Sequence, residues 1–326
     1  MQHPMNAISA VLRGAAIASC IAIVAALGAP SPAASQTALI PVHLGVTPND
    51  DMVSVVYAQR SGLFAKAGLD VTIEKATSGA AIAAAVVSGA YDIGKSSITP
   101  MFDAHEAGLP FVLIAPAAIY EAKSPYGGLV SAVEPHMGKD LEGKIIGSNS
   151  GNDIGTLGIK AWMAKTGGDP AALRHIEIPM SAVPAAIDQH RIDGGEMVYP
   201  PLFAALDGGK LHLTPTLSAI APAFLFSVWF TTKDYSAHHP DVVKTFARVV
   251  AQAATYTNAH PAETVKLLAD FTGVAAEDIA RMPRVRNGTS LTAALIQPAI
   301  DAAVKYGTTK AAFPAADLID PLVLAK

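Results

Sequence analysis

The segment from Gly62 to Gly94 constrains the fold most, because a helix end, a strand, a polar turn, a second helix and a second strand follow one another there with few spare residues. Gly62 and Gly68 are typical of a helix end, since glycine readily adopts the left-handed backbone conformation that helix termini use. Residues 69–74 alternate apolar and polar side chains, which predicts a strand. Residues 80–87 are rich in alanine and predict a short helix. This order indicates an α/β fold.

The same order continues on both sides of this segment. We predict strands over 39–46, 91–94 and 111–114, and helices over 52–59 and 99–108. Strands that alternate with helices favour a parallel sheet with right-handed crossovers. In such sheets, ligands bind beyond the carboxyl ends of the strands.

Three polar turns follow strands in this first half, so we take them as candidate ligand-binding segments. The candidate residues are Asp51, Met52, Ser78, Gly79, Ala80, Ser96 and Ser97. The turn before the helix at 80–87 would present unpaired backbone amides and the positive end of a helix dipole to an anion. Asp50 or Asp51 is interpreted mainly as a cap of the following helix, with a direct ligand contact as the alternative. The segment 95–97 is predicted to be a loop.

The second half repeats this arrangement. A strand over 145–148 leads through a polar loop to a helix over about 154–165. The candidate residues in this half are Tyr126, Ser150, Asn152, Asp153, Glu196 and Tyr199. The two acids, Asp153 and Glu196, have two interpretations. Either they cap a helix or form an ion pair within the protein, or they accept hydrogen bonds from donor groups of a ligand. The two tyrosines either pack in the interior or stack on a flat ligand.

The first 34 residues have the order of a secretory signal. Arg13 precedes an apolar run over 15–27, and small residues follow it. We therefore expect export to the periplasm, and we do not expect a lipid anchor at Cys20. Cys20 is the single cysteine of the chain, so the exported protein would have no disulfide. Removal of this segment takes away one arginine and no acid and leaves 22 basic and 27 acidic residues. This balance does not suggest a nucleic-acid partner.

Several catalytic motifs are absent or out of context. Residues 89–96 match the P-loop pattern, but a true P-loop follows a strand and opens a helix, whereas here the first glycine ends a helix. The sequence has no G-x-S-x-G elbow and no H-E-x-x-H motif. The pair His238-His239 is interpreted as a solvated helix entry. We therefore expect no metal, no cofactor and no catalytic residue.

Five segments together resemble a known family. They are GLFAKAGLDV at 62–71, SGAA at 78–81, SGAYDIG at 88–94, DLEGKIIG at 140–147 and the element ending in YPP at 193–201. Their order resembles that of the nitrate/sulfonate/taurine/thiamine-pyrimidine group of solute-binding proteins, the NitT/TauT and NMT1/THI5-like family. The resemblance covers nearly the whole exported chain.

The resemblance implies a type II periplasmic-binding-protein fold, in which each of two lobes is a mainly parallel sheet flanked by helices. We expect the first lobe over 36–126 and 231–326, and the second over 127–230. It also implies a monomer that binds a sulfonate, carboxylate or pyrimidine and delivers it to an ABC permease in the inner membrane.

Two other functions remain open. The first is a ligand-sensing module for a membrane receptor. The second is an enzyme, since the fold also resembles pyrimidine synthases of thiamine biosynthesis. Those enzymes carry a cysteine-rich motif that this chain lacks.

Overall fold

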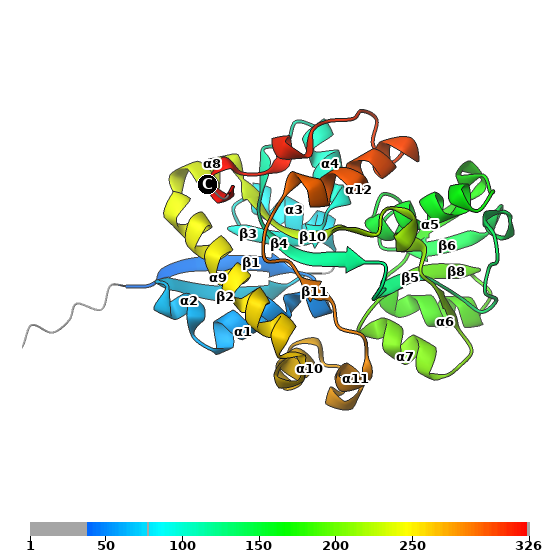
Figure 1. The fold of residues 1–326 in the computed structure, drawn as a ribbon, viewed down its shortest axis with the longest axis horizontal. Coiled ribbons are helices and arrows are strands. Elements are labelled where there is room, and N and C mark those ends of the chain that lie inside the picture. The colour runs from blue at the N-terminus through cyan, green and yellow to red at the C-terminus, as the bar shows by residue number, and fades with distance from the viewer. Residues whose placement is uncertain (1–37, 77, 325–326) are drawn as a thin grey trace, which may run out of the picture. The chain divides into compact units, whose positions relative to one another are not determined.

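A computed structural model describes residues 38–76 and 78–324, coloured along the chain in Figure 1. The predicted signal over 1–34, with Cys20, lies outside the described residues. No helix within the described ranges is long and apolar enough to cross a membrane.

Two sheets organise the described residues. The first has six strands in the order β11-β4-β10-β3-β1-β2, and the second has five in the order β7-β6-β8-β5-β9. The strands are β1 Ile40–Val46, β2 Leu69–Lys75, β3 Ile93–Ser97, β4 Phe111–Glu121, β5 Gly127–Ser131, β6 Ile145–Ser148, β7 Arg174–Glu177, β8 Gly194–Val198, β9 His212–Thr214, β10 Ala223–Thr232 and β11 Arg286–Asn287.

The helices lie mostly between consecutive strands, as the sequence pattern predicts. They are α1 Val53–Arg60, α2 Leu63–Lys66, α3 Gly79–Val87, α4 Thr99–Glu106, α5 Ile154–Lys165, α6 Val183–Asp188, α7 Pro201–Asp207, α8 Lys233–His238, α9 Pro240–Ala259, α10 Val265–Thr272, α11 Ala276–Arg281 and α12 Ala293–Lys305. A short 3-10 helix, η1, covers Asp50–Met52 between β1 and α1.

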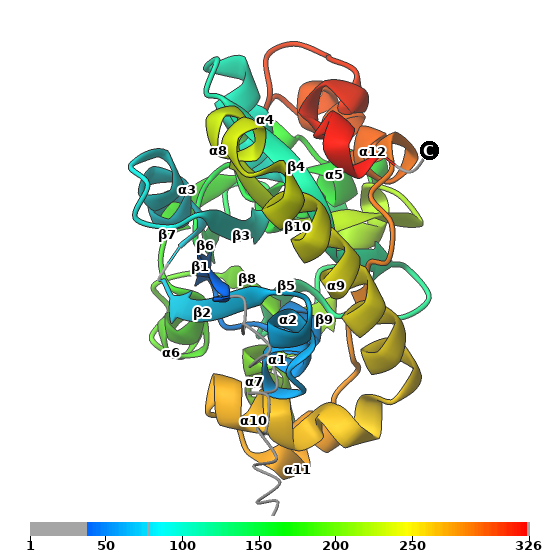
Figure 2. The same cartoon turned by 90° about the vertical axis from the view of Figure 1, so that its left-hand side faces the viewer.

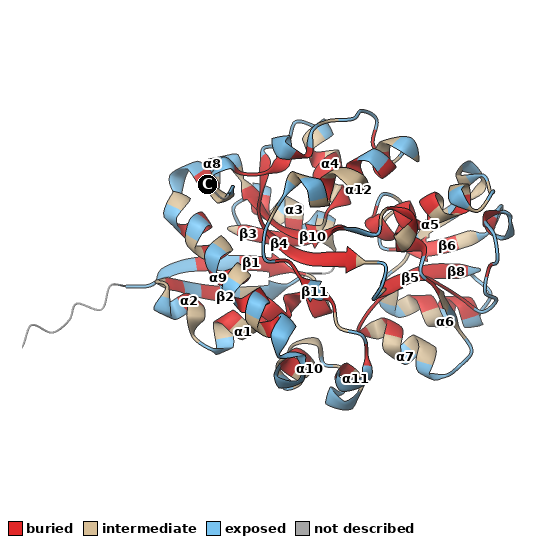
Figure 3. Ribbon diagram, viewed as in Figure 1, coloured by how far each residue is buried: buried red, intermediate tan, exposed pale blue. Residues whose placement is uncertain are grey.

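Helices cover both faces of the first sheet. Figure 2 shows α3, α4 and α12 on one side of it and α1 and α2 on the other. Strand β4 contributes to two apolar clusters, since Leu113 belongs to the same cluster as Phe102 and Ile300, while its neighbours Val112 and Ile114 belong to the second cluster. Because both faces are covered, β4 and β10 are buried along nearly their whole length (Figure 3). This explains their almost continuous apolar sequence.

The second sheet is also covered on both faces, with α5 on one side and α6 and α7 on the other (Figure 1). The chain reaches it from β4 through residues 122–126 and leaves it through residues 215–222 into β10.

Both sheets are mixed, whereas the sequence analysis predicted mainly parallel ones. In the first sheet, β1 runs parallel to β2 and β3, but β10 runs antiparallel to β3 and β4. In the second sheet, β6 runs parallel to β7 and β8, but β5 runs antiparallel to β8 and β9. The cause is the returning chain. Strand β10 comes back from the second sheet and inserts between β3 and β4.

The segment Lys95–Ser97 is a second difference. It was predicted to be a loop, but it forms the end of β3, and its Lys95 and Ser96 side chains are buried. Lys95 and Ser96 pair with Trp229 and Val228 of β10, so a strand from far along the chain supplies the hydrogen bonds that a loop would lack.

Candidate functional site

Ser96 lies at the end of β3 against the first turn of α3. Its hydroxyl is buried and makes no hydrogen bond within the described residues. A Cβ atom at Gly79 would lie 2.4 Å from the Ser96 Oγ atom, so glycine at the first position of α3 allows this close approach. Ser78 caps the helix by accepting a hydrogen bond from the Ala81 amide at 3.2 Å. An unpaired hydroxyl therefore lies beside a helix N-terminus.

Glu196 has the equivalent position in the second sheet. It lies on β8 and is 4% exposed, and its side chain packs on the first turn of α5. A Cβ atom at Gly155 would lie 1.9 Å from the Glu196 Cγ atom and 2.7 Å from its Oε1 atom. Asp153 caps this helix by accepting a hydrogen bond from the Thr156 amide at 2.7 Å. Each sheet thus places one polar side chain against a glycine in the first turn of a helix.

Tyr126 lies between the acidic groups of the two sheets. The side chain is 4% exposed, and its hydroxyl has no hydrogen-bond partner within the described ranges. Burial raises the pKa of Tyr126 well above its usual value, and the nearby carboxylates of Asp51 and Glu196 raise it further. Because Asp51 precedes the first sheet's α1 and Glu196 belongs to the second sheet, Tyr126 connects the two halves of the candidate site.

Asp51 is held by an ion pair that the sequence analysis did not predict. The Lys95 Nζ atom lies 2.6 Å from the Asp51 Oδ1 atom, and both side chains are buried. The Ser227 hydroxyl, on β10, donates to the other carboxylate oxygen at 2.6 Å. The charge of Lys95 is therefore balanced within the protein.

Asp50 is also paired rather than acting as a helix cap. The Arg284 Nη2 atom lies 2.8 Å from the Asp50 Oδ1 atom, and the Val285 amide donates to Oδ2 at 2.6 Å. Burial raises the pKa of Asp50, while the charge and hydrogen bonds of Arg284 lower it. The interpretation of Asp50 or Asp51 as a cap is wrong, because both lie inside η1, and Asn49 at its N-cap makes no capping bond.

The pair Glu196 and Asp153 is the most unusual electrostatic feature of the site. Burial raises the pKa of Glu196 well above its usual range, and the neighbouring Asp153 carboxylate raises it further. Burial also raises the pKa of Asp153, but hydrogen bonds from Thr156, Ser148 and Ser150 oppose that change. Asp153 is thus the better stabilised anion of the two, and Glu196 is the acid whose pKa is raised further.

The other predicted residues differ in their placement. Met52 is completely buried in the apolar cluster of the first sheet, whereas Ser97, Ser150 and Ala80 are partly or fully exposed near the helix N-termini. The last two predicted residues are Asn152 and Tyr199. The side-chain amide of Asn152 donates a hydrogen bond to the Asp103 carboxylate of α4 at 3.5 Å, and the backbone amide of Tyr199 donates to the Tyr126 carbonyl at 3.0 Å. Asn152 therefore links the α5 loop to a helix of the first sheet.

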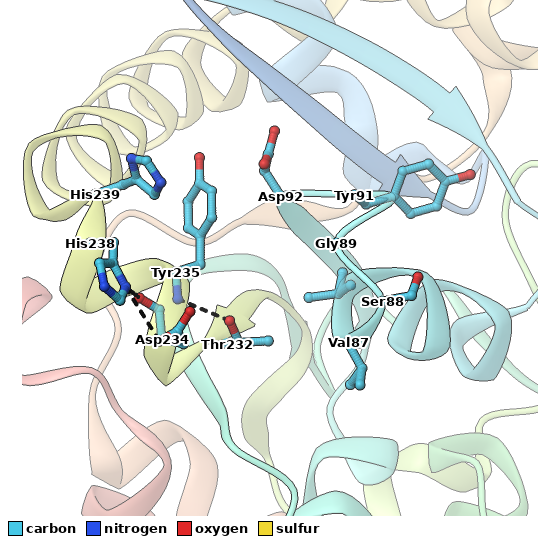
Figure 4. A pocket seen from close by; sticks show the side chains of 11 residues that line it. Val87, Ser88, Gly89, Tyr91, Asp92, Thr232, Asp234, Tyr235, His238 and His239 are labelled. Carbon is cyan, nitrogen blue, oxygen red and sulfur yellow. Dashed lines mark hydrogen bonds and ion pairs between the residues drawn. The ribbon is translucent and has the colours of Figure 1, made fainter.

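Two cavities lie away from these residues. One, of about 440 Å³, is lined by the end of α3 and by α8, including Asp92, Tyr235, His238 and His239 (Figure 4). The other, of about 360 Å³, lies beside Arg284 and Asn287. Neither includes a predicted ligand-binding residue. In the part of the chain that the structure describes, no three His, Cys, Asp or Glu side chains are grouped to hold a metal ion.

Sequence reasoning missed Lys95, Ser227, Arg284 and the role of Gly155. For Lys95 a signal existed, since it is a single charge between the apolar strand start at Ile93 and the apolar Ile98. For the others the signal is absent, because their partners are distant in the sequence.

Comparisons with known proteins agree with this architecture. A family model described as NMT1/THI5 like matches residues 49–264. The taurine-binding periplasmic protein of Escherichia coli (strain K12) is 28% identical over 245 residues, which cover 72% of this chain and 74% of the relative. The 4-amino-5-hydroxymethyl-2-methylpyrimidine phosphate synthase of Schizosaccharomyces pombe is 25% identical over 226 residues, which cover 65% of this chain and 63% of the relative.

Among solved structures, the periplasmic aliphatic sulphonate binding protein SsuA from Escherichia coli is similar, with a TM-score of 0.69 and 17% identity. The match covers 86% of this chain and 92% of SsuA. This likeness confirms the predicted two-lobed α/β periplasmic-binding-protein fold.

Proposed function

The chain belongs to the NMT1/THI5-like family of solute-binding proteins, and we propose that it captures a small organic ligand between its two lobes and delivers it to an ABC permease. The ligand class is a sulfonate, a carboxylate or a pyrimidine. The observation that carries this proposal is that the buried hydroxyls of Ser96 and Tyr126 have no hydrogen-bond partner within the described residues, while the buried side chain of Glu196 lies against the first turn of α5.

Such groups favour ligand binding for an energetic reason. A buried polar atom without a hydrogen bond costs about 1–3 kcal/mol, and a ligand that supplies the missing partner offsets this cost. The amides in the first turns of α3 and α5 add the positive ends of two helix dipoles, which stabilise an anionic group. Lys95 and Arg284 are engaged by Asp51 and Asp50, so neutral hydrogen bonds would hold the anion.

Contacts from both lobes also explain how a permease would recognise the loaded protein. A ligand that touches Ser96 on the first sheet and Glu196 on the second favours the closed arrangement of the lobes, because it binds that arrangement more tightly. This function requires no covalent chemistry. The predicted signal and the periplasmic relatives support a periplasmic location.

The test uses the full chain, expressed with its N-terminal segment and purified after export. Native mass spectra and melting temperatures are measured against a panel of alkanesulfonates, aromatic carboxylates and pyrimidines. We expect at least one compound to bind unchanged, in a 1:1 ratio, and to raise the melting temperature. If no compound in the three classes binds, the proposed function is wrong.

The relative among pyrimidine phosphate synthases favours a second candidate, an enzyme of pyrimidine synthesis. The same mass spectra distinguish the two functions. A carrier leaves the mass of the bound compound unchanged after prolonged incubation, whereas an enzyme alters the compound or its own mass.

A further inference from the structure

We propose that the cavity between the end of α3 and α8 is a second binding site, and that it binds a small organic cation such as a quaternary ammonium compound. This site goes beyond the proposed function, because a carrier needs only the ligand that lies between its sheets. The cavity lies away from the candidate site at Ser96 and Glu196 and is lined by different residues.

The cavity lies at the opposite end of β3 from the candidate site. Ser96 is near the end of this strand, whereas Asp92, which lines the cavity, directly precedes its first residue. Strand β10 runs antiparallel to β3 and ends at Thr232, which also lines the cavity. A strand rises about 3.3 Å per residue, so the path from Asp92 to Ser96 covers about 13 Å. A small compound in the cavity therefore cannot also contact Ser96.

The size and the walls of the cavity suit a small molecule. Its volume is about 440 Å³, and small-molecule sites commonly have about 300–1,000 Å³. One wall is formed by α8, where the rings of Tyr235 and His239 lie with their centroids 4.6 Å apart. Figure 4 shows the Tyr235 ring between His239 and Asp92, with Val87 of α3 on the opposite side. Val87 is 51% exposed, so the cavity offers apolar surface as well as aromatic rings.

The lining of the cavity carries negative charge. Its acids are Asp92 and Asp234, and among the described residues that form the lining there is no lysine or arginine. The Asp92 carboxylate accepts a hydrogen bond from the His43 backbone amide at 2.8 Å, and this neutral donor leaves its charge in place. Burial raises the pKa of Tyr235, and the nearby Asp92 carboxylate raises it further. The negative charge of Asp92 therefore acts beside the aromatic wall.

Two further features favour a cation. The cavity lies at the C-terminal end of α3, which carries the negative end of the helix dipole. The His238 Nδ1 atom lies 2.8 Å from the Asp234 carbonyl oxygen and donates to it, so this imidazole needs no second proton to make its contact. At pH 8, where imidazoles are generally neutral, the two carboxylates are the charges that a ligand in the cavity meets.

This lining favours an organic cation over an anion or a metal ion. An anion would meet two carboxylates, and within the described ranges no three His, Cys, Asp or Glu side chains are grouped to hold a metal ion. A quaternary ammonium group carries a positive charge on an apolar surface of methyl groups. Its charge would be attracted by Asp92 and Asp234, and its methyl groups would contact the Tyr235 ring and Val87.

The experiment is a ligand-observed NMR titration at pH 8, with the protein expressed as the full chain and purified after export. The two probes are choline and 3,3-dimethyl-1-butanol, which have the same shape, although only choline carries a charge. We expect choline to bind with a Kd of about 1 mM or lower. We also expect it to bind at least about fivefold more tightly than the neutral compound, as an exposed cation–π contact and surface ion pairs together imply.

The double variant Asp92→Asn with Asp234→Asn should lose this preference, and asparagine at position 92 keeps an acceptor for the His43 amide. Asp234 is 84% exposed, so Asp234→Asn alone leaves the core intact, and it should weaken choline binding by about two- to fivefold. Asp70→Asn is the matched control, because it removes an exposed carboxylate from β2 of the same sheet, and it should keep the preference. The comparison of the two probes on the wild-type protein needs no variant.

The outcomes also separate this site from the proposed function. If the two probes bind the wild-type protein equally, or if neither binds with a Kd below about 10 mM, the cavity is not a cation site. If choline is preferred but Asp234→Asn and the double variant bind it as tightly as the wild-type protein, it binds elsewhere and the assignment is wrong. A protein that binds no sulfonate, carboxylate or pyrimidine would refute the proposed function and leave this site unaffected.

Discussion

Replacement of Lys95 with methionine should destabilise the protein by about 3–5 kcal/mol, because it leaves the buried carboxylate of Asp51 without its counter-ion. The methionine side chain is close in length to the lysine stem, so the packing in β3 changes little. The effect therefore measures the charge and not the volume.

The structure determines this magnitude. Lys95 and Asp51 are 1% and 5% exposed, and their charged atoms are 2.6 Å apart, so water cannot replace the lost partner. Ser227 keeps its hydrogen bond to the second carboxylate oxygen, which places the expected loss near the lower end, at about 3 kcal/mol. An exposed pair would contribute only about 0–1 kcal/mol.

The assay is urea-induced unfolding at pH 7, followed by circular dichroism. Lys123→Met is the matched control, because the Lys123 side chain is 78% exposed and its Nζ atom lies 3.6 Å from the Glu121 Oε1 atom. This variant should change stability by less than about 1 kcal/mol. The double variant Lys95→Met with Asp51→Asn should recover much of the loss, because no unpaired charge remains. A loss below about 1 kcal/mol for Lys95→Met alone would refute the reasoning.

Three further predictions concern the first turn of α5. Gly155→Ala should destabilise the protein by about 1–3 kcal/mol, since the new Cβ atom would meet Glu196. Gly208→Ala is the control, because its Cβ atom meets no atom within 4 Å and stability should not fall. Urea unfolding of both variants checks this prediction. Asp153→Ala removes the cap of α5 and should cost about 0.5–2 kcal/mol in the same assay, and an unchanged midpoint would contradict the capping role. Because the pKa of Glu196 is raised in the folded state, its contribution to the free energy of unfolding falls as pH rises above about 4.5. Glu196→Gln should therefore match the wild-type stability near pH 4 and exceed it increasingly toward pH 8, and a constant difference would show that the pKa is not raised.

Local patterns predicted the helices that frame the site. The helix predicted over about 154–165 is α5 at Ile154–Lys165, and the one predicted over 80–87 is α3 at Gly79–Val87. Both were predictable because their caps, Asp153 and Ser78, act within three residues and are visible in the sequence. The candidate residues at these two N-termini came from the same local reasoning.

Contacts between distant residues were not predictable. Asp50 and Asp51 were interpreted as caps, but their partners Arg284 and Lys95 lie 234 and 44 residues away. A single sequence gives no signal for such pairs, and a charged residue within 95–97 favours a loop until its buried partner is known. The insertion of β10 between β3 and β4 was hidden for the same reason, since strand order depends on how the chain returns from the second sheet.

The crystal structure of the protein with a bound ligand from the panel tests the central claim most directly. We predict that the ligand lies between the two sheets, within hydrogen-bond distance of the Ser96 and Tyr126 hydroxyls and of the Glu196 carboxyl. Ligand density confined to the cavity beside His238 and His239 (Figure 4), with these three groups still unpaired, would contradict the assignment of the site.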